Sequence, residues 1–130
     1  MNQNIYMLDK RKNIRYESTA KAIVEGISEE EAVLKDISVT GCRIKVDNYL
    51  EIKPHTQHKL KIIPEKVSNI SSFQLNVEAK WVGTEVDSFL FGFGITKSPE
   101  GKQFERYVDY LSWRYSQGSS MIGDSGTEIL

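Results

Sequence analysis

The chain of 130 residues has one cysteine and no long apolar run, and each shortage excludes a class of protein. A single cysteine, Cys42, cannot form an internal disulfide, which fits a reducing compartment and a small core residue. No apolar run approaches the roughly 20 residues of a membrane span, and the polar first dozen residues form no signal-peptide core. We therefore expect a cytoplasmic protein without membrane insertion.

Histidine is also scarce, and the sequence gives little support to an enzyme. The two histidines, His55 and His58, lie three residues apart beside Pro54. A metal or acid/base site needs further ligands or an oriented partner, and no such cluster is visible in the sequence. We expect both histidines to be loop residues, and we expect no catalytic residues, no metal and no cofactor.

An excess of charge of either sign is missing as well. Seventeen Lys and Arg stand against eighteen Asp and Glu, so the formal net charge is −1. No global field draws such a chain to nucleic acid, and any anion site must be local. Single-stranded nucleic acid binding by a small barrel is a possible alternative, but the charge balance and the lack of a basic-aromatic face weigh against it.

Six segments have the alternation of apolar and polar residues that half-buried strands show. These predicted strands are 19–25, 32–37, 42–46, 59–63, 73–81 and 89–95. The alternation in 73–81 is the longest and includes Trp81, so this strand should be long. Gly92 and Gly94 in the last strand indicate strong coiling or the close approach of another backbone. Local antiparallel strands of this length close most economically as a six-stranded antiparallel β-barrel.

A helix should follow the strands. Ser98 and Pro99 offer an N-cap and a proline at the first helical position. Apolar residues then recur at intervals of three and four, which predicts one apolar stripe that covers or plugs the barrel. The stripe consists of Phe104, Tyr107, Val108, Leu111 and Tyr115. The opposite side would carry Arg106, Tyr110 and Trp113. The predicted fold class is all-β with a C-terminal helix.

Two short motifs carry the candidate chemistry. In the segment DISVTG, Asp36, Ser38 and Gly41 would meet on one hairpin and offer an acceptor, a small hydroxyl and a residue without a Cβ. The alternative is ordinary turn chemistry, since these residue types favour turns. Upstream, the segment KRKNIR packs four cations into six residues, with Arg11 and Arg15 four apart. Two such guanidiniums can close on an anion, although a solvated basic stretch near the terminus would look the same.

Together, Arg11-x-x-x-Arg15 and Asp36-x-Ser38-x-x-Gly41 resemble the paired signature of PilZ domains, which are bacterial receptors for cyclic di-GMP. In layout the resemblance covers roughly residues 10–115, but only the two motifs match residue by residue. It implies a split-barrel PilZ fold and a cyclic di-GMP site.

The resemblance also suggests which residues would contact the ligand. The implied site residues are Lys10, Arg11, Arg15, Asp36, Ser38, Gly41 and Trp81. Lys10 stands where the family often has an arginine that helps to accommodate a stacked ligand pair, so one or two ligands per site stay open. Trp81 stands where some relatives place an aromatic residue beside the ligand, although its strand alternation is equally compatible with the core.

We expect a non-enzymatic receptor or adaptor in three parts: an N-terminal arm (1–18), a barrel with its helix (19–116) and a flexible tail (117–130). The arm should close over cyclic di-GMP and pass the signal to a protein partner in motility, adhesion or envelope functions. The alternative is a PilZ-like protein interaction module that binds no nucleotide. The sequence leaves the partner, the oligomeric state and the role of residues 1–9 open.

Overall fold

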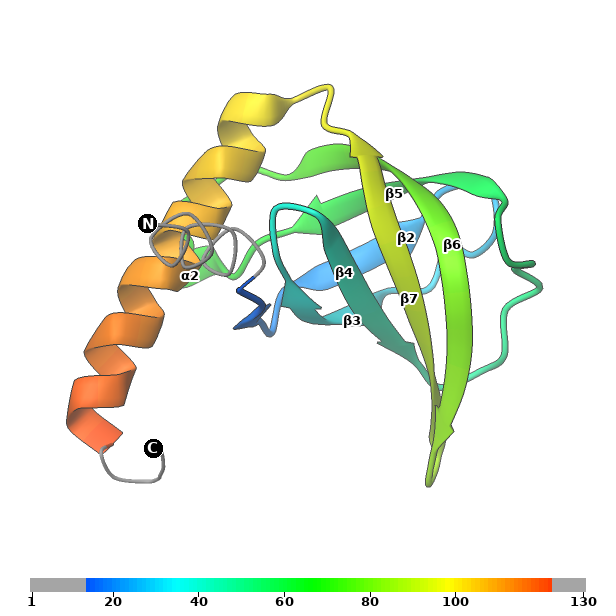
Figure 1. Cartoon of the computed structure of the whole chain (residues 1–130), viewed down its shortest axis with the longest axis horizontal. Coiled ribbons are helices and arrows are strands. Elements are labelled where there is room, and N and C mark those ends of the chain that lie inside the picture. Colours follow the sequence, from blue (N-terminus) through cyan, green and yellow to red (C-terminus); the bar gives the residue numbers. More distant parts are fainter. Residues whose placement is uncertain (1–13, 123–130) are drawn as a thin grey trace, which may run out of the picture.

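The computed structural model describes residues 14–122. Its strands are β1 (Tyr16–Glu17), β2 (Lys21–Val24), β3 (Ala32–Ile37), β4 (Gly41–Val46), β5 (Gln57–Ile63), β6 (Phe73–Glu85) and β7 (Ser88–Lys97). A short 3-10 helix, η1 (Lys66–Ser68), follows β5, and the α-helix α2 (Gly101–Ile122) ends the described chain. Figure 1 shows a barrel of strands with α2 beside it.

Six strands, β2 to β7, close into a ring of antiparallel pairs. The order around the ring is β3-β2-β5-β6-β7-β4, and the pairing of β4 with β3 closes it. The short β1 pairs with the end of β3, where Tyr16 lies opposite Ile37. The predicted six-stranded antiparallel barrel with a C-terminal helix is confirmed.

The first predicted strand, 19–25, corresponds to β2, and the short β1 precedes it within the segment predicted as the arm. Both β1 and β2 pair with β3. Backbone hydrogen bonds continue between them, from Ser18 N to Lys35 O and from Leu34 N to Ala20 O. The interruption occurs where the Ser18 hydroxyl accepts a hydrogen bond from Ala20 N at 2.9 Å. This local bond occupies the Ala20 N–H group, and it starts a polar network described below.

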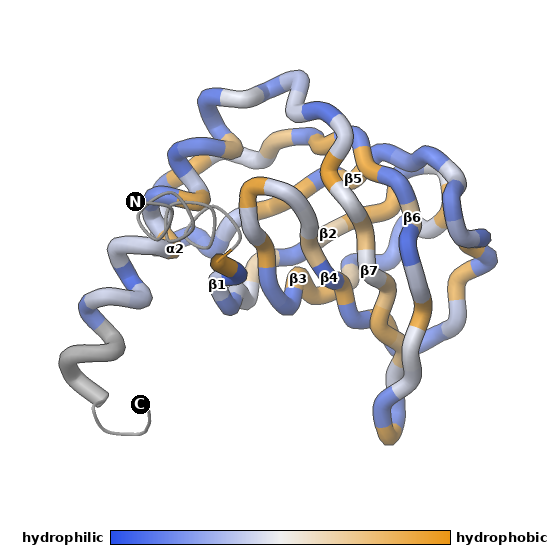
Figure 2. Tube along the Cα trace, in the orientation of Figure 1, coloured by the Kyte–Doolittle hydropathy of each residue, from blue (hydrophilic) through white to orange (hydrophobic). Residues whose placement is uncertain are grey.

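The core fills the barrel with the inward residues of every strand, because successive side chains of a strand point to opposite faces. Figure 2 shows hydrophobic and hydrophilic residues alternating along the strands. The fully buried residues include Leu34, Ile44, Leu60, Leu75 and Phe91. The β6–β7 hairpin continues past the predicted end at Trp81 and turns only after Glu85.

The predicted helix stripe packs on the core through Phe104, Tyr107 and Leu111, which are all buried. The prediction that Tyr110 lies on the opposite side is wrong. Its ring stacks on Tyr107 with centroids 6.2 Å apart and packs against the core. The stack is possible because residues three apart are neighbours on a helix. The helix continues to Ile122, past the predicted start of the tail at 117, while residues 123–130 lie outside the described residues.

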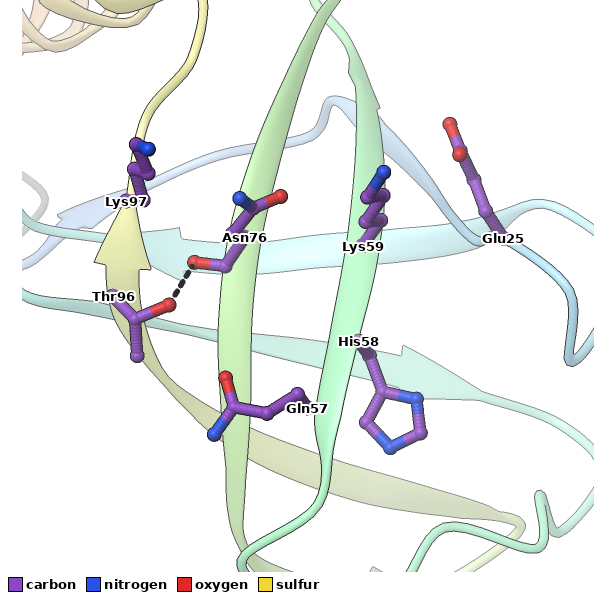
Figure 3. Close-up of a pocket in the computed structure, with 7 residues that line it drawn as sticks. All are labelled: Glu25, Gln57, His58, Lys59, Asn76, Thr96 and Lys97. Carbon is purple, nitrogen blue, oxygen red and sulfur yellow. Dashed lines mark hydrogen bonds between the residues drawn. The ribbon is translucent and has the colours of Figure 1, made fainter.

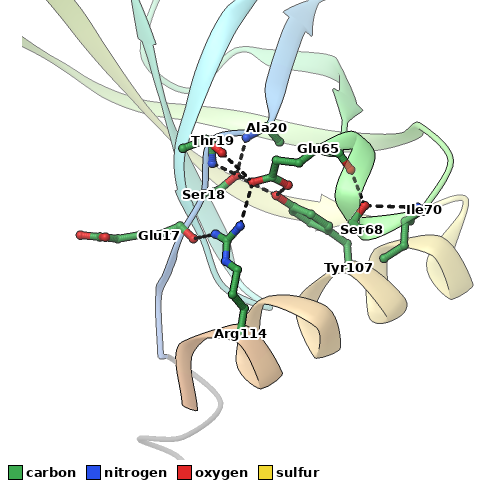
Figure 4. Close-up of polar contacts among 9 residues, drawn as sticks. All are labelled: Glu17, Ser18, Thr19, Ala20, Glu65, Ser68, Ile70, Tyr107 and Arg114. Carbon is green, nitrogen blue, oxygen red and sulfur yellow. Dashed lines mark hydrogen bonds and ion pairs between the residues drawn. The ribbon is translucent and has the colours of Figure 1, made fainter. Parts of the chain in front are cut away.

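A polar network joins α2 to the start of the barrel (Figure 4). The buried Tyr107 hydroxyl donates to Glu65 Oε1 at 2.8 Å and lies 2.8 Å from Ser18 Oγ, so Ser18 must be the donor in that second bond. Glu65 Oε2 also accepts hydrogen bonds from Thr19 N and Thr19 Oγ1, each at 2.9 Å. Arg114 completes the network, with Nη1 3.4 Å from Glu65 Oε2 and Nη2 donating to Glu17 O at 3.1 Å.

Burial alone would raise the pKa of Glu65, but hydrogen bonds from Thr19 and Tyr107 outweigh it and hold that pKa below its ordinary value. Burial raises the pKa of Tyr107, so this phenol keeps its proton. The network is therefore a carboxylate held by neutral donors and one guanidinium. It fastens the helix to the residues that directly follow Arg15.

Tyr107→Phe should weaken this attachment without emptying the core, because the ring stays and only the hydroxyl is lost. We expect the free energy of unfolding to fall by about 1–3 kcal/mol, since the Ser18 and Glu65 oxygens lose a buried partner. Urea denaturation followed by circular dichroism measures this difference.

Tyr110→Phe is the matched control for that measurement. Its ring stacks on Tyr107, and no hydrogen bond of its hydroxyl lies within residues 14–117. The control should change the free energy of unfolding by less than about 0.5 kcal/mol. Equal losses in the two variants would contradict an anchoring role for the Tyr107 hydroxyl.

Candidate functional site

The turn between β3 and β4 is held by Ser38. Its backbone N–H donates to Gly41 O at 2.8 Å, and its hydroxyl oxygen accepts from Thr40 N and Gly41 N, each at 3.1 Å. The hydroxyl proton is left for Gly41 O or Thr40 Oγ1, which both lie at 3.3 Å. In this structure Ser38 shapes the corner, as serine commonly does in turns.

A β-bulge turns Asp36 outward. Leu34 lies opposite Ile44 inside the barrel, and the next pair along the strands is Asp36 opposite Arg43, so the register shifts between Leu34 and Asp36. An extra residue in one strand reverses the alternation of side chains locally. Asp36 therefore shares the outer face with Arg43, while Ile37 points inward again and is fully buried.

Two arginines share the Asp36 carboxylate, whose side chain is only 7% exposed. Arg43 donates to Oδ2 through Nε at 2.9 Å and through Nη2 at 2.5 Å. Arg15 donates to Oδ1 through Nη1 at 3.3 Å. The hydrogen bond with Asp36 is the main cause that raises the pKa of Arg43. The result is a compact cluster with two positive charges and one negative charge.

Three glycines form the surface beside this cluster. Gly41 lies opposite Gly94, and Arg43 lies opposite Gly92, so the three glycines sit on the outer face of β4 and β7. We call Gly41, Gly92 and Gly94 the glycine floor. A Cβ on Gly41 would lie 2.8 Å from Phe93 O and 3.5 Å from Arg15 Nη2. The Arg15 guanidinium thus lies close over Gly41, where a side chain would not fit.

Trp81 also lies on this outer face. The inward residues that precede it in β6 are buried, the last of them being Ala79, but Trp81 is 45% exposed. The register shifts between Ala79, opposite Phe93, and Trp81, opposite Gly92. A Cβ on Gly92 would collide with the indole, so the ring lies directly over that glycine. The sequence left Trp81 open between the core and the ligand site, and the bulge places it on the outer face.

Of the predicted site residues, Arg15, Asp36, Ser38 and Gly41 therefore come together at one corner. Trp81 lies in the same cross-strand row, which runs from Asp36 through Arg43 and Gly92 to Trp81. Lys10 and Arg11 lie outside the described residues. Sequence reasoning missed Arg43, whose one signal was its outward position in the alternation of 42–46.

Apart from this corner, the barrel has a hollow of about 520 Å³. Figure 3 shows its lining side chains, which come mainly from β5, β6 and β7. The hollow is lined by Glu25, Gln57, His58, Lys59, Asn76, Thr96 and Lys97. None of these residues belongs to the Asp36 corner. His58 was expected in a loop but lies in β5, where its Nε2 is 2.6 Å from Thr56 Oγ1.

The second histidine, His55, lies in a loop as expected and pairs with Glu78 at 3.3 Å. Within residues 14–122, no group of three or more His, Cys, Asp or Glu side chains could hold a metal ion. In the same part of the chain, no helix has the length and apolar character needed to cross a bilayer.

Gly41→Ala should destabilise the fold, because its Cβ would press on a backbone carbonyl of the neighbouring strand. We expect the free energy of unfolding to fall by about 1–3 kcal/mol, as for other overpacked positions, in a urea denaturation experiment. Gly94→Ala is the matched control on the partner strand. Its Cβ would meet only the end of the flexible Lys80 side chain, at 2.9 Å from Cε, which can move aside. A larger loss for Gly94→Ala would contradict this reasoning.

No protein-family model matches the chain, and no curated protein sequence matches it. Among solved structures, the chain is similar to the Bacillus subtilis inhibitor of motility MotI/DgrA, with a TM-score of 0.69 and 11% identity over 80% of this chain and 50% of that one. The Borreliella burgdorferi PlzA protein in complex with c-di-GMP matches with a TM-score of 0.45 and 16% identity over 85% of this chain and 45% of that one. The chain thus spans about half the length of each. The fold shared with MotI/DgrA, a closed six-stranded barrel with a C-terminal helix, is that of a PilZ-like domain.

Proposed function

We propose that the chain is a cyclic di-GMP receptor whose ligand lies on the outer face of the barrel, over the glycine floor. One observation carries the proposal: Arg15, Asp36 and Gly41, which belong to two motifs far apart in the sequence, lie together beside Trp81. Arg15 Nη1 is 3.3 Å from Asp36 Oδ1 although the residues are 21 positions apart. The other implied ligand residues are Lys10, Arg11 and Ser38.

The chemistry of this face suits a cyclic dinucleotide, which carries two phosphates and two guanines. Arginine forks bind phosphates or guanine O6 and N7, and Asp36 can accept hydrogen bonds from guanine N–H groups. The glycine floor has no Cβ atoms of its own, so the ligand can approach the backbone where the Arg15 and Lys80 side chains that lie over Gly41 and Gly94 move aside. The exposed face of the Trp81 indole offers a platform on which a base can stack. Ser38 contributes by holding the turn that carries Gly41.

The arm 1–18 would supply the conformational change. Arg15 would leave Asp36 for a phosphate, and Lys10 and Arg11 would close from the same side. Ordering a segment costs about 1–2 kcal/mol per residue, and charge-assisted hydrogen bonds of about 1.5–3 kcal/mol each offset that cost, so we expect moderate affinity.

The signal would pass from the arm to α2 and on to a protein partner. Directly after Arg15, the Tyr16 ring meets the Tyr115 ring edge-on, with centroids 6.0 Å apart, and Glu17 O accepts a hydrogen bond from Arg114. A moving arm would therefore disturb the helix. MotI/DgrA is by name an inhibitor of motility, so motility is the first behaviour to test. We place the receptor in the cytoplasm, without enzymatic activity of its own.

A second candidate function is a protein interaction module that binds no nucleotide. The observation that favours it is the closed ion cluster, since Arg15 and Arg43 already neutralise Asp36 without a ligand. The exposed Trp113 of α2, at 58%, would then belong to the partner surface. Equal partner binding with and without cyclic di-GMP would favour this second function.

Arg15→Ala should remove cyclic di-GMP binding and leave the barrel folded, because its side chain is 47% exposed and contributes nothing to the core. Arg11→Ala should do the same. Isothermal titration calorimetry measures binding, and circular dichroism checks the fold. Arg106→Ala, which removes an exposed helix arginine, is the control and should bind as the parent chain does. Absence of binding by the intact, folded parent chain would refute the proposal.

Tryptophan fluorescence tests the place of the ligand, because the chain has only two tryptophans. In Trp113→Phe the remaining Trp81 should be quenched by cyclic di-GMP, since a base stacks on its indole. In Trp81→Ala binding should weaken by about 1–3 kcal/mol, the usual contribution of base stacking on an aromatic side chain. Unchanged emission of Trp81 at saturating ligand would place the nucleotide elsewhere.

A further inference from the structure

The two arginines that share Asp36 are not equivalent. Arg43 holds a single carboxylate oxygen, Oδ2, with two short hydrogen bonds of 2.9 and 2.5 Å. Arg15 reaches the other oxygen, Oδ1, with one contact of 3.3 Å. Short charge-assisted bonds from two nitrogens of one guanidinium are stronger than one long bond. Arg43 is therefore the firmer partner of Asp36.

The backbone is also held more firmly at Arg43 than at Arg15. Arg43 lies within β4 and is paired on both sides, with Asp36 of β3 and with Gly92 of β7. Arg15 precedes the two-residue strand β1, which pairs only with the end of β3. A hydrogen-bonded strand on each side fixes the backbone of Arg43. Arg15 can turn away through small changes in the backbone next to β1. Arg15 is thus the arginine that can leave.

Asp36 cannot lose both partners. Its side chain is 7% exposed, and a carboxylate that is so far removed from water needs a cation or several donors. When Arg15 turns to a phosphate, Arg43 keeps Oδ2 neutralised, and Oδ1 is released. Oδ1 then needs a new donor, and the N1–H and N2–H groups of guanine provide a pair of donors on one edge. Adenine presents an acceptor at N1, which a carboxylate oxygen would repel.

We propose that Arg43 is a positioning residue of the nucleotide site, which holds Asp36 so that Oδ1 accepts from guanine once Arg15 has moved to the ligand. This inference rests on the proposed cyclic di-GMP function and deepens it, because it makes base selection depend on a residue outside both motifs. Arg43 acts through Asp36 and needs no contact with the ligand.

The test compares the parent chain with Arg43→Ala and Arg43→Lys in titrations with cyclic di-GMP and with cyclic di-AMP. Arg43→Ala should bind cyclic di-GMP about 10- to 100-fold more weakly, the loss of a hydrogen bond to a charged group, and should also lose preference for guanine over adenine. Arg43→Lys keeps the positive charge but loses the planar guanidinium, so its affinity and its base preference should both lie between those of the parent chain and of Arg43→Ala.

Lys45→Ala is the matched control for these titrations. Lys45 lies two residues further along β4 and pairs with Glu85 at 3.8 Å, away from Asp36. Its removal takes one cation from the same strand and should change the affinity for cyclic di-GMP less than about threefold, as expected for an exposed ion pair. Urea denaturation of each variant checks the fold, and if Arg43→Ala does not fold, the base preference of Arg43→Lys carries the test.

The outcomes separate this inference from the function on which it rests. If the parent chain binds no cyclic di-GMP, both are overturned. If the parent chain binds and Arg43→Ala binds equally or more tightly, only the role of Arg43 is overturned. A weaker affinity for both nucleotides with an unchanged ratio would also overturn it, because a purely structural or electrostatic effect does not discriminate between bases.

Discussion

The charge of Asp36 has to be balanced on a surface where little water reaches it. Its carboxylate is 7% exposed and meets two guanidiniums, from Arg15 and Arg43. Burying a carboxylate without such partners would be strongly unfavourable, so the positions of both arginines are tied to this one group. Any anion that attracts Arg15 must therefore leave Asp36 with a sufficient counter-charge, and Arg43 meets that requirement.

Two bulges make this surface. One reverses the alternation before Asp36, and the other reverses it between Ala79 and Trp81. Without the bulges, the carboxylate of Asp36 and the indole of Trp81 would both point into the core. The glycines of β4 and β7 leave room for Trp81 and Arg15 to lie against the backbone. Irregular strands with small residues thus place charged and aromatic side chains on one face of the barrel.

The alternation of apolar and polar residues was enough to predict the barrel, its six strands and the helix. A shared ligand site for Arg15 and Asp36 was implied by a motif resemblance, not by strand patterns, and the ion pair between them was not predicted. The role of Arg43 and the inward place of Tyr110 escaped prediction, and the place of Trp81 was left open between the core and the ligand site. The alternation of 42–46 places Arg43 on the outer face, but only a register shift in β3 brings Asp36 opposite it. Another register shift turns Trp81 outward, and a ring stack places Tyr110 against Tyr107.

The site and the helix are linked by the few residues that follow Arg15, since Tyr16 touches Tyr115 and Glu17 O binds Arg114. A receptor could use this link to convert an exchange of ion pairs into a helix movement. A crystal structure with cyclic di-GMP tests that exchange most directly. We predict Arg15 on a phosphate, with Arg43 still on Asp36 and guanine over the glycine floor. A nucleotide bound in the hollow beside His58, with Arg15 still on Asp36, would contradict the account.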